Sequence, residues 1–249
     1  MLGPEQVRRF FEDGYVMIPR LFRPDEVARM RAAFDRIERV AQGLRESCMH
    51  HGSQFVLSRG TDGTRVTIAR VVWCGAVEPE LSRLGRDERL LRIAATLLGS
   101  SEVSQLINQA HFKAPGDGVD FPWHQDSIHR RYGGSEWRDV NGRGSYVQTL
   151  TAVDDVGADN GPLELIPRSC CVGHAGLPEG ELPAEIDPGE AVAATMAAGD
   201  VLAFGPYTFH RSGANESDRS RRVFINGYAH PGANSRIYPG CGVGRRLRI

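Results

Sequence analysis

The chain has no surplus of either charge, few cysteines and no long run of apolar residues. Its 30 lysine and arginine residues are matched by 31 aspartate and glutamate residues, which leaves a formal net charge of -1 at pH 7. Without a positive surplus there is no summed field to hold a phosphate backbone, so nucleic acid is not an expected partner. Lys113 is the one lysine, so nearly all of the positive charge belongs to arginine.

The five cysteines argue against a disulfide framework and against a thiolate zinc site, because their number is odd and no pair has the Cys-x-x-Cys spacing. The chain also lacks the roughly 20 consecutive apolar residues of a membrane span, and its first residues do not follow the pattern of a secretory signal. We therefore expect a cytoplasmic protein that does not bind membranes.

What is present is an ordinary globular composition over 249 residues, of which 41% are hydrophobic and 24% charged. That length supports a sizeable core. Glycine and proline are spread along the chain, and no repeat or linker divides it. We expect a single domain over residues 1–249, with mixed, mainly helical support in 1–100 and a β core in 101–230.

Local patterns predict the elements of the first hundred residues. Apolar residues at helical spacing predict helices over 4–13, 24–45 and 87–98, the first two beginning at a proline and the last ending at Gly99. Apolar and β-branched runs predict strands over 15–18 and 65–73. The N-terminal third is therefore expected to be mixed.

From residue 102 onward the pattern changes to short β-like runs separated by turn residues. No helical segments alternate with these runs, so a sandwich or barrel is favoured over a doubly wound parallel sheet. Residues 170–199 are expected to form a long excursion or lid, and 245–249 a solvated tail. The predicted strands are 103–113, 145–153, 162–166, 200–204, 207–212 and 221–229.

The sharpest chemical signal is His124-Gln125-Asp126. Residues two apart on an extended chain point to the same side, so the imidazole and the carboxylate can reach one metal ion. Taken alone, this spacing also fits a hydrogen-bonded surface pair. His210, which follows the apolar run 200–204, is a candidate third ligand and also fits an ordinary core histidine.

Arg221, eleven residues after His210, is a candidate for holding a carboxylate. A guanidinium offers two parallel hydrogen bonds, a geometry that lysine cannot reproduce. Arg219 and Arg222 compete for this role, and a solvated side chain remains an alternative for each of the three.

These segments together resemble the phytanoyl-CoA dioxygenase family of Fe(II)- and 2-oxoglutarate-dependent oxygenases. The resemblance rests on WHQD at 123–126, NGPLELIPRS at 160–169, GDVLAF at 199–204 and HRSGANESDRSR at 210–221. Residues 112–126, FKAPGDGVDFPWHQD, are similar to a stretch of bacterial ectoine hydroxylases. The resemblance implies a double-stranded β-helix, a cupin-like jelly-roll barrel of two antiparallel sheets with N-terminal helices packed on one of them.

The resemblance also implies roles for single residues. His124, Asp126 and His210 would bind iron, and they are the expected catalytic centre. Two positions depart from the family pattern: His111 stands where the ectoine hydroxylases have asparagine, and Cys170 where the family usually has histidine. Arg221 would hold the distal carboxylate of 2-oxoglutarate, and Ser212, Gln109, His111 and Lys113 would lie beside that cosubstrate.

The implied reaction uses Fe(II), 2-oxoglutarate and O2 to hydroxylate, or otherwise oxidise, an unactivated C–H bond of a small molecule. We expect an amino acid or a natural-product intermediate of secondary metabolism. Arg130, Trp137 and Phe204 are the expected substrate contacts, and Arg130, if it faces the site, would indicate an acidic group on the substrate. The alternatives are an acyl-CoA hydroxylase, a cupin-like metal-dependent hydrolase or isomerase that needs no Arg221, and a catalytically silent binding protein.

Overall fold

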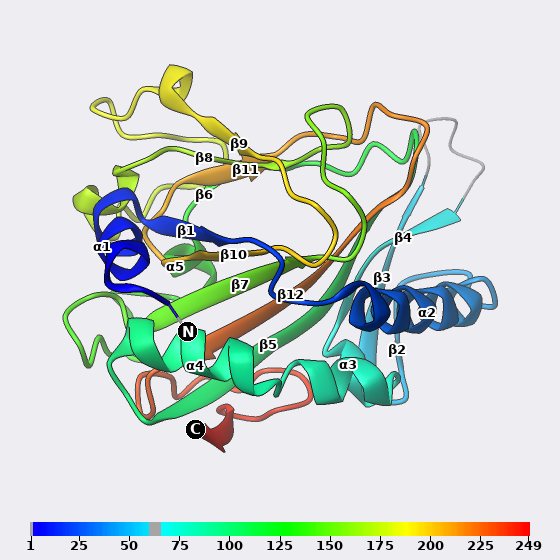
Figure 1. Ribbon diagram of the computed structural model, residues 1–249, viewed down its shortest axis with the longest axis horizontal. Helices are drawn as coiled ribbons and strands as arrows, with labels where there is room; N and C mark the ends of the chain where they lie inside the picture. The colour runs from blue at the N-terminus through cyan, green and yellow to red at the C-terminus, as the bar shows by residue number, and fades with distance from the viewer. Residues whose placement is uncertain (1, 60–65) are drawn as a thin grey trace.

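The structure, a computed structural model, describes residues 2–59 and 66–249. Its strands form two sheets. Within each sheet, neighbouring strands pair antiparallel, as predicted for a jelly roll. In Figure 1 the smaller sheet lies above the long strands of the larger one. The smaller sheet has the order β6 (Phe121–His124), β11 (His210–Ser212), β8 (Leu163–Leu165), β9 (Val192–Ala194).

The larger sheet combines the predicted core strands with strands from the N-terminal third. At one edge the strand of residues 15–18 pairs with that of 201–204, and at the other a hairpin continues the sheet. Its order is β1 (Tyr15–Ile18), β10 (Val201–Phe204), β7 (Tyr146–Ala152), β12 (Arg221–Ala229), β5 (Glu102–Lys113), β4 (Val66–Val72), β3 (Ser53–Arg59) and β2 (Cys48–His50), with β13 (Arg245–Arg248) paired to β5.

The predicted helices are present, and their ends follow their capping residues. Gly14 ends the first in the left-handed conformation, with φ 88°, and Asp87 caps the fourth through the Arg89 amide. The second stops four residues short of its predicted end, because the apolar periodicity ceases before Gln42. The helices are α1 (Pro4–Asp13), α2 (Pro24–Ala41), α3 (Pro79–Leu84), α4 (Glu88–Leu98) and α5 (Asp126–His129), with 3-10 turns at Cys74–Ala76, Ser169–Val172 and Pro188–Glu190.

The central strands are buried on both faces, because helices cover one face and the smaller sheet the other. On β12, Val223 and Ile225 belong to the cluster between the sheets, whereas Phe224 belongs to the cluster under the helices. Phe34 of α2 packs against Phe112 of β5, with ring centroids 5.1 Å apart. This alternation turns every second residue of β12 toward the smaller sheet.

Two segments differ from their predictions. Residues 245–249 are not a solvated tail, because β13 pairs with β5 and Leu247 packs against the core under the helices. The arginines around Leu247 led to the prediction of a solvated tail, although this segment forms a strand whose burial alternates. The excursion 170–199 is not all loop, because β9 pairs with β8. The β2–β3 hairpin was not predicted from the sequence.

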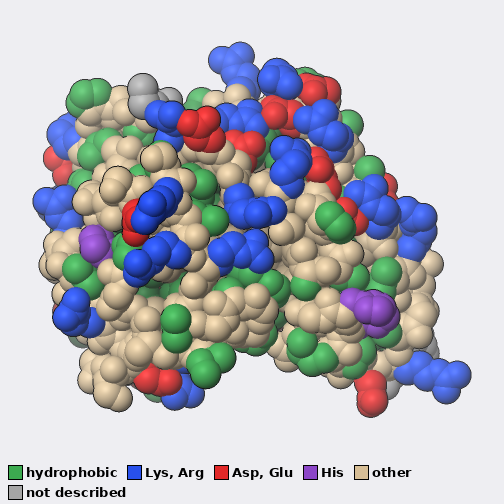
Figure 2. Space-filling model, turned by 90° about the horizontal axis from the view of Figure 1, so that it is seen from below, with side chains coloured by type: hydrophobic (Ala, Val, Ile, Leu, Met, Phe, Trp, Pro, Cys, Tyr) green, Lys and Arg blue, Asp and Glu red, His purple; other side chains and the backbone are tan. Residues whose placement is uncertain are grey.

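The surface carries arginines that are largely paired with acidic side chains. Figure 2 shows basic side chains spread over one face and interleaved with acidic ones. Arg8 binds Glu5 and Glu12, and Arg83 binds Glu80. In the described part of the chain, no helix is both long enough and apolar enough to cross a membrane.

Candidate active site

A cavity of about 680 Å³ is lined by residues of both sheets and of the segments around α5 and residues 236–239. Val223 and Ile225 of β12, Leu150 of β7 and Phe204 of β10 form apolar wall on the side of the larger sheet. His124, Leu163, His210 and Ser212 contribute from the smaller sheet. The side chains predicted from sequence to bind iron and cosubstrate can therefore meet in one space.

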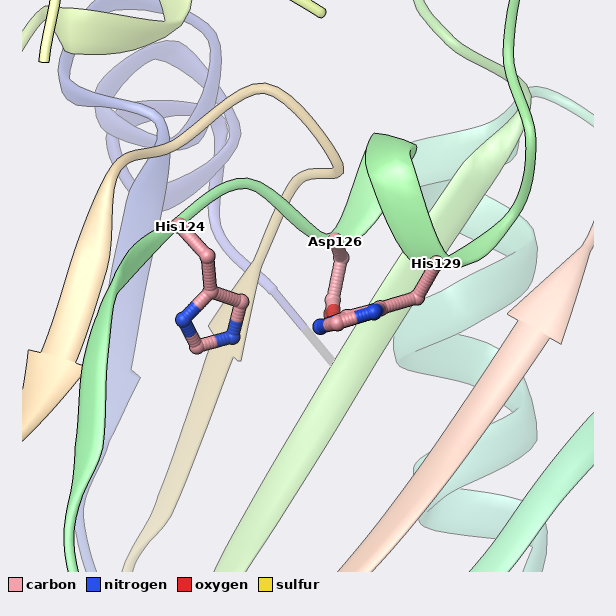
Figure 3. Close-up of side chains that lie close together, drawn as sticks. All are labelled: His124, Asp126 and His129. Carbon is pink, nitrogen blue, oxygen red and sulfur yellow. The ribbon is translucent and has the colours of Figure 1, made fainter. Parts of the chain in front are cut away.

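The three predicted iron ligands come together where β6 ends. His124 closes β6 and pairs in register with His210 of β11, so their ring centroids lie 4.2 Å apart. Asp126 begins α5 immediately after β6. In Figure 3 the side chains of His124 and Asp126 face a common space. All three residues line the cavity.

A backbone carbonyl orients the Nδ1 of both histidines and so leaves Nε2 as the nitrogen for a metal. The Nδ1 of His124 lies 2.7 Å from the carbonyl oxygen of Pro122, and that of His210 lies 2.9 Å from the carbonyl oxygen of Thr208. A carbonyl oxygen only accepts hydrogen bonds, so each Nδ1 carries the proton. Each Nε2 is therefore left with a free lone pair, which is how backbone partners orient ligand histidines.

The charge states of His210 and Asp126 also suit a divalent cation. Burial, together with the neighbouring His124, lowers the pKa of His210 to about 3, so the ring is neutral at pH 7. Burial alone would raise the pKa of Asp126, but Arg130 and the histidines outweigh it and the pKa is lowered. The buried Oδ2 atom of Asp126 has no hydrogen-bond partner within residues 2–59 and 66–249. Such an atom is costly unless a ligand satisfies it, so the donor set fits a metal.

His129 is a fourth metal-ligating side chain at this point, and the sequence reasoning did not find it. Its ligand atom and those of His124 and Asp126 all lie within 4.8 Å of one another. Figure 3 shows the His129 ring beside the Asp126 carboxylate. Residues three apart share a side only on a helix. Because the sequence predicted an extended chain here, the turn of α5 that brings His129 to the site was missed.

The predicted cosubstrate residues form a second polar cluster. Arg221 begins β12 opposite Lys113 on β5. The Arg221 guanidinium donates to the carbonyl oxygen of Gly161 and, at 3.2 Å, to the Ser212 hydroxyl. The Lys113 ammonium donates to the hydroxyl and the carbonyl oxygen of Ser212 and to the carbonyl oxygen of Gly213. Lys113 acts behind the cavity, whereas Arg221 and Ser212 line it.

Arg221 and Lys113 are two buried cations without an ion pair in the described residues. Arg221 is 4% exposed, and no described residue supplies an acceptor to its Nε. Burial lowers the pKa of Arg221 to about 10, and burial with the charge of Arg221 lowers the pKa of Lys113 to about 7. A carboxylate bound here would relieve both cations, so the cluster fits a keto acid with a distal carboxylate.

The structure separates Arg221 from its two competitors. Arg219 pairs with Asp159 at the surface, and Arg222 pairs with Asp154 and Asp35 on the outer side of the sheet. Arg221 alone of the three lines the cavity. Because neighbouring residues of a strand point to opposite faces, Arg221 and Arg222 cannot both enter it.

Gln109 and His111 line the cavity from β5, as the shared strand face predicts. The His111 Nε2 lies 2.8 Å from the Gln109 side-chain oxygen. Burial, reinforced by the positive charges of Arg70, Arg221 and Lys113, lowers the pKa of His111 to about 3. A neutral His111 thus offers hydrogen-bonding groups to the cavity without adding charge.

Of the three predicted substrate contacts, Arg130 and Phe204 line the cavity and Trp137 does not. The Phe204 ring lies 4.8 Å from that of His210. Trp137 instead stacks on Tyr132, at 4.7 Å, and donates to the carbonyl oxygen of Gly144. Trp137 is a buried core residue and does not line the cavity.

Comparison with known proteins identifies relatives over most of the chain. Ectoine dioxygenase of Bordetella bronchiseptica is 28% identical over 249 residues, which cover 90% of this chain and 74% of the relative. L-proline trans-4-hydroxylase of Streptomyces griseoviridis is 29% identical over 173 residues, 69% of this chain and 55% of the relative. The crystal structure of EctD from S. alaskensis with 2-oxoglutarate and 5-hydroxyectoine superposes with a TM-score of 0.74 at 24% identity, covering 93% and 77% of the two chains.

The family model described as phytanoyl-CoA dioxygenase (PhyH) matches residues 10–223. This match includes α2 to α5, the smaller sheet, most strands of the larger sheet and all of the predicted ligand positions. It confirms the predicted enzyme class, an oxygenase that depends on Fe(II) and 2-oxoglutarate, and the structural likeness confirms the jelly-roll fold. The chain belongs to the phytanoyl-CoA dioxygenase family.

Proposed function

We propose that this enzyme hydroxylates an unactivated C–H bond of a small molecule, an amino acid or a natural-product intermediate. His124, Asp126 and His210 would hold the iron. Arg221 and Ser212 would hold the distal carboxylate of 2-oxoglutarate. The observation that carries the proposal is the presence of two clusters in one cavity. One is a histidine pair oriented by backbone carbonyls beside a carboxylate oxygen that has no hydrogen-bond partner in the described residues. The other holds a buried arginine that forms no ion pair with a described acidic residue.

When iron and 2-oxoglutarate are bound, they supply the oxidising chemistry, in which 2-oxoglutarate and O2 give succinate and CO2 and one oxygen atom enters the substrate. The chain contributes position and environment. The backbone carbonyls of Pro122 and Thr208 keep the two Nε2 atoms available. The apolar wall of Leu150, Val223 and Ile225 excludes water from the space beside the ligands.

The substrate class rests on the size of the cavity and on the named relatives. A cavity of about 680 Å³ lies in the usual range for small-molecule sites and must also hold the cosubstrate. Two relatives carry the names of enzymes for ectoine and L-proline, which are small and polar. We also place the reaction in the cytoplasm, which is supported by five cysteines that are all free thiols.

The test is an anaerobic titration of the protein with Fe(II) and 2-oxoglutarate, followed through the visible charge-transfer band that a chelated keto acid gives with ferrous iron. The wild-type protein should show the band. His124→Ala should abolish it. Arg221→Ala should weaken 2-oxoglutarate binding by about 10- to 150-fold, the loss expected for a charge-assisted hydrogen bond.

Arg219→Ala is the matched control, because it removes an arginine two residues away that is paired at the surface. It should bind 2-oxoglutarate like the wild type. Substrates are then sought by succinate release and by a mass increase of one oxygen atom. A folded, iron-loaded protein without the band would contradict the proposal and favour a metal-dependent hydrolase or isomerase on the same ligands.

A further inference from the structure

Arg130 is a buried cation whose hydrogen-bonding capacity is largely unused. The residue is 7% exposed, and its buried Nε has no acceptor among the described residues. The guanidinium donates to the Tyr238 hydroxyl over a long distance, 3.3 Å, and its other polar neighbour is the Tyr146 hydroxyl. The guanidinium lies over the rings of Tyr146 and Tyr238, 5.0 and 5.4 Å from their centroids. Cation–π contacts offset part of the desolvation, but a guanidinium has five N–H donors, and they favour an anion.

No acidic side chain of the described residues forms an ion pair with Arg130. The carboxylate whose charge acts on it is Asp126, four residues earlier on α5. In the proposed function Asp126 is a ligand of the iron, so its charge is already shared with the metal. Arg130 therefore lines the cavity as a cation in need of a partner.

A second arginine of the same kind lies on this wall. Arg236 lines the cavity, and its guanidinium is 5.1 Å from the ring centroid of Tyr238 on the chain segment before β13. It donates to the carbonyl oxygen of His129 at 3.0 Å and forms no ion pair in the described residues. Arg131 differs, because it is exposed and pairs with Glu136 at 2.8 Å. Tyr238 is thus flanked by two cations without acidic partners.

The charge of the whole lining leads to the same conclusion. Five arginines and three carboxylates line the cavity, which gives these side chains a net formal charge of +2, or +1 when the Glu136 partner of Arg131 is counted. The charge of +2 on Fe(II) and the charge of -2 on 2-oxoglutarate cancel one another. The positive surplus is therefore unchanged by the cofactors and is left for the remaining ligand, the substrate.

Arg130 and Arg221 lie near opposite ends of β12, so one anion cannot satisfy both. Arg221 is the first residue of β12, whereas Tyr146, over which Arg130 lies, pairs with Ala229 at the other end. Eight residues of extended chain span roughly 26 Å. The candidate metal ligands lie on the smaller sheet and at the start of α5, and both arginines line the same cavity.

We propose that Arg130, with Arg236 and the Tyr238 hydroxyl, binds an oxyanion of the substrate, a carboxylate or a phosphate. The proposal rests on the proposed function and narrows its substrate class to small acidic molecules that react at a C–H bond beside the iron. Arg130 is the specificity-determining residue, because the unpaired Nε edge of its guanidinium can hold two oxygens of one group. A neutral analogue such as the amide would leave the cation buried and unpaired.

The test uses the protein loaded anaerobically with Fe(II) and saturating 2-oxoglutarate. Its thermal unfolding is followed in sodium acetate, sodium phosphate, sodium chloride and acetamide, with ionic strength matched throughout. Acetate or phosphate should raise Tm in a saturable way beyond chloride and acetamide, because a ligand of the native state stabilises it. The arm with the tighter binding distinguishes a carboxylate site from a phosphate site.

Arg130→Gln should lower the affinity for the oxyanion that stabilises the wild type at least tenfold. It should keep the 2-oxoglutarate charge-transfer band. Arg138→Gln is the matched control, because Arg138 is exposed and outside the lining; it should behave like the wild type. If Arg130→Gln does not fold, Arg236→Gln replaces it as the test variant and should also lower the affinity for the oxyanion. The proposal would be overturned if neither acetate nor phosphate raised the Tm of the wild type beyond chloride and acetamide, or if the oxyanion affinity of Arg130→Gln were unchanged. A wild type without the band refutes the proposed function instead, and the anion titration still decides whether Arg130 forms an oxyanion site.

Discussion

Replacing Gln125 by leucine should both destabilise the protein and weaken iron binding. Gln125 lies between two predicted iron ligands and is 4% exposed. Its amide donates to the carbonyl oxygens of Gly173 at 2.8 Å and Tyr207 at 2.7 Å, and its side-chain oxygen accepts from the Ala175 amide at 2.9 Å. One side chain therefore joins the ligand-bearing turn to the 170–199 segment and to the turn before β11.

The size of the effect follows from these contacts. Leucine has a similar volume, so packing is largely kept while two carbonyl oxygens and one amide lose their partner. At about 1 kcal/mol for each hydrogen bond, the free energy of unfolding should fall by about 3 kcal/mol. The His124–Asp126 turn also loses its anchor. Removing support behind metal ligands typically lowers metal affinity 10- to 100-fold, and we expect a loss of Fe(II) affinity in that range.

Two measurements check this prediction. Urea unfolding of the metal-free protein gives the stability change, and anaerobic Fe(II) titration at saturating 2-oxoglutarate gives the affinity. Gln54→Leu is the control, since Gln54 is exposed on β3, and its effect should stay within about 0.5 kcal/mol. A Gln125→Leu protein within 1 kcal/mol of wild type and with unchanged iron affinity would refute the reasoning.

Three further predictions concern Lys113, Glu26 and Gly227. Burial lowers the pKa of Lys113 to about 7, and a bound anion would raise it again. The affinity for 2-oxoglutarate should therefore fall as pH rises above 7. In charge-transfer titrations, Lys113→Met should flatten this pH dependence. The hydrogen bond from Arg89 lowers the pKa of Glu26 to about 2, so Glu26→Gln should cost about 3 kcal/mol in urea unfolding at pH 7, a difference that disappears as pH falls from 4.5 towards 2. A Cβ at Gly227 would overlap the Tyr146 hydroxyl, so Gly227→Ala should cost about 1–3 kcal/mol in thermal unfolding.

Each of these has a distinct contrary result. An equally steep pH dependence in Lys113→Met would assign the titration to another group. A stability difference for Glu26→Gln that persists at pH 2 would mean that packing, and not charge, holds the pair. Wild-type stability in Gly227→Ala would show that the Tyr146 ring can move freely, which is incompatible with its close packing beneath Arg130.

The sequence by itself determined the local elements and the residue types of the site. Proline and glycine at the ends of apolar, helix-spaced runs predicted α1 and α4 almost to the residue, because capping is a property of neighbours in the chain. His124, Asp126 and His210 were predicted as iron ligands from short motifs in the same way, and all three line the cavity. Their spacing within short motifs, together with the family resemblance, carries the chemistry before any contact is known.

Only the tertiary structure decided which of several equivalent side chains enter the cavity. Arg221 faces inward and Arg222 outward because they are adjacent on a strand. His129 lies close to His124 and Asp126 because a single helical turn follows β6. Trp137 packs in the core, where it stacks on Tyr132, and does not line the cavity. Such choices depend on contacts between segments far apart in sequence, and no local pattern contains them.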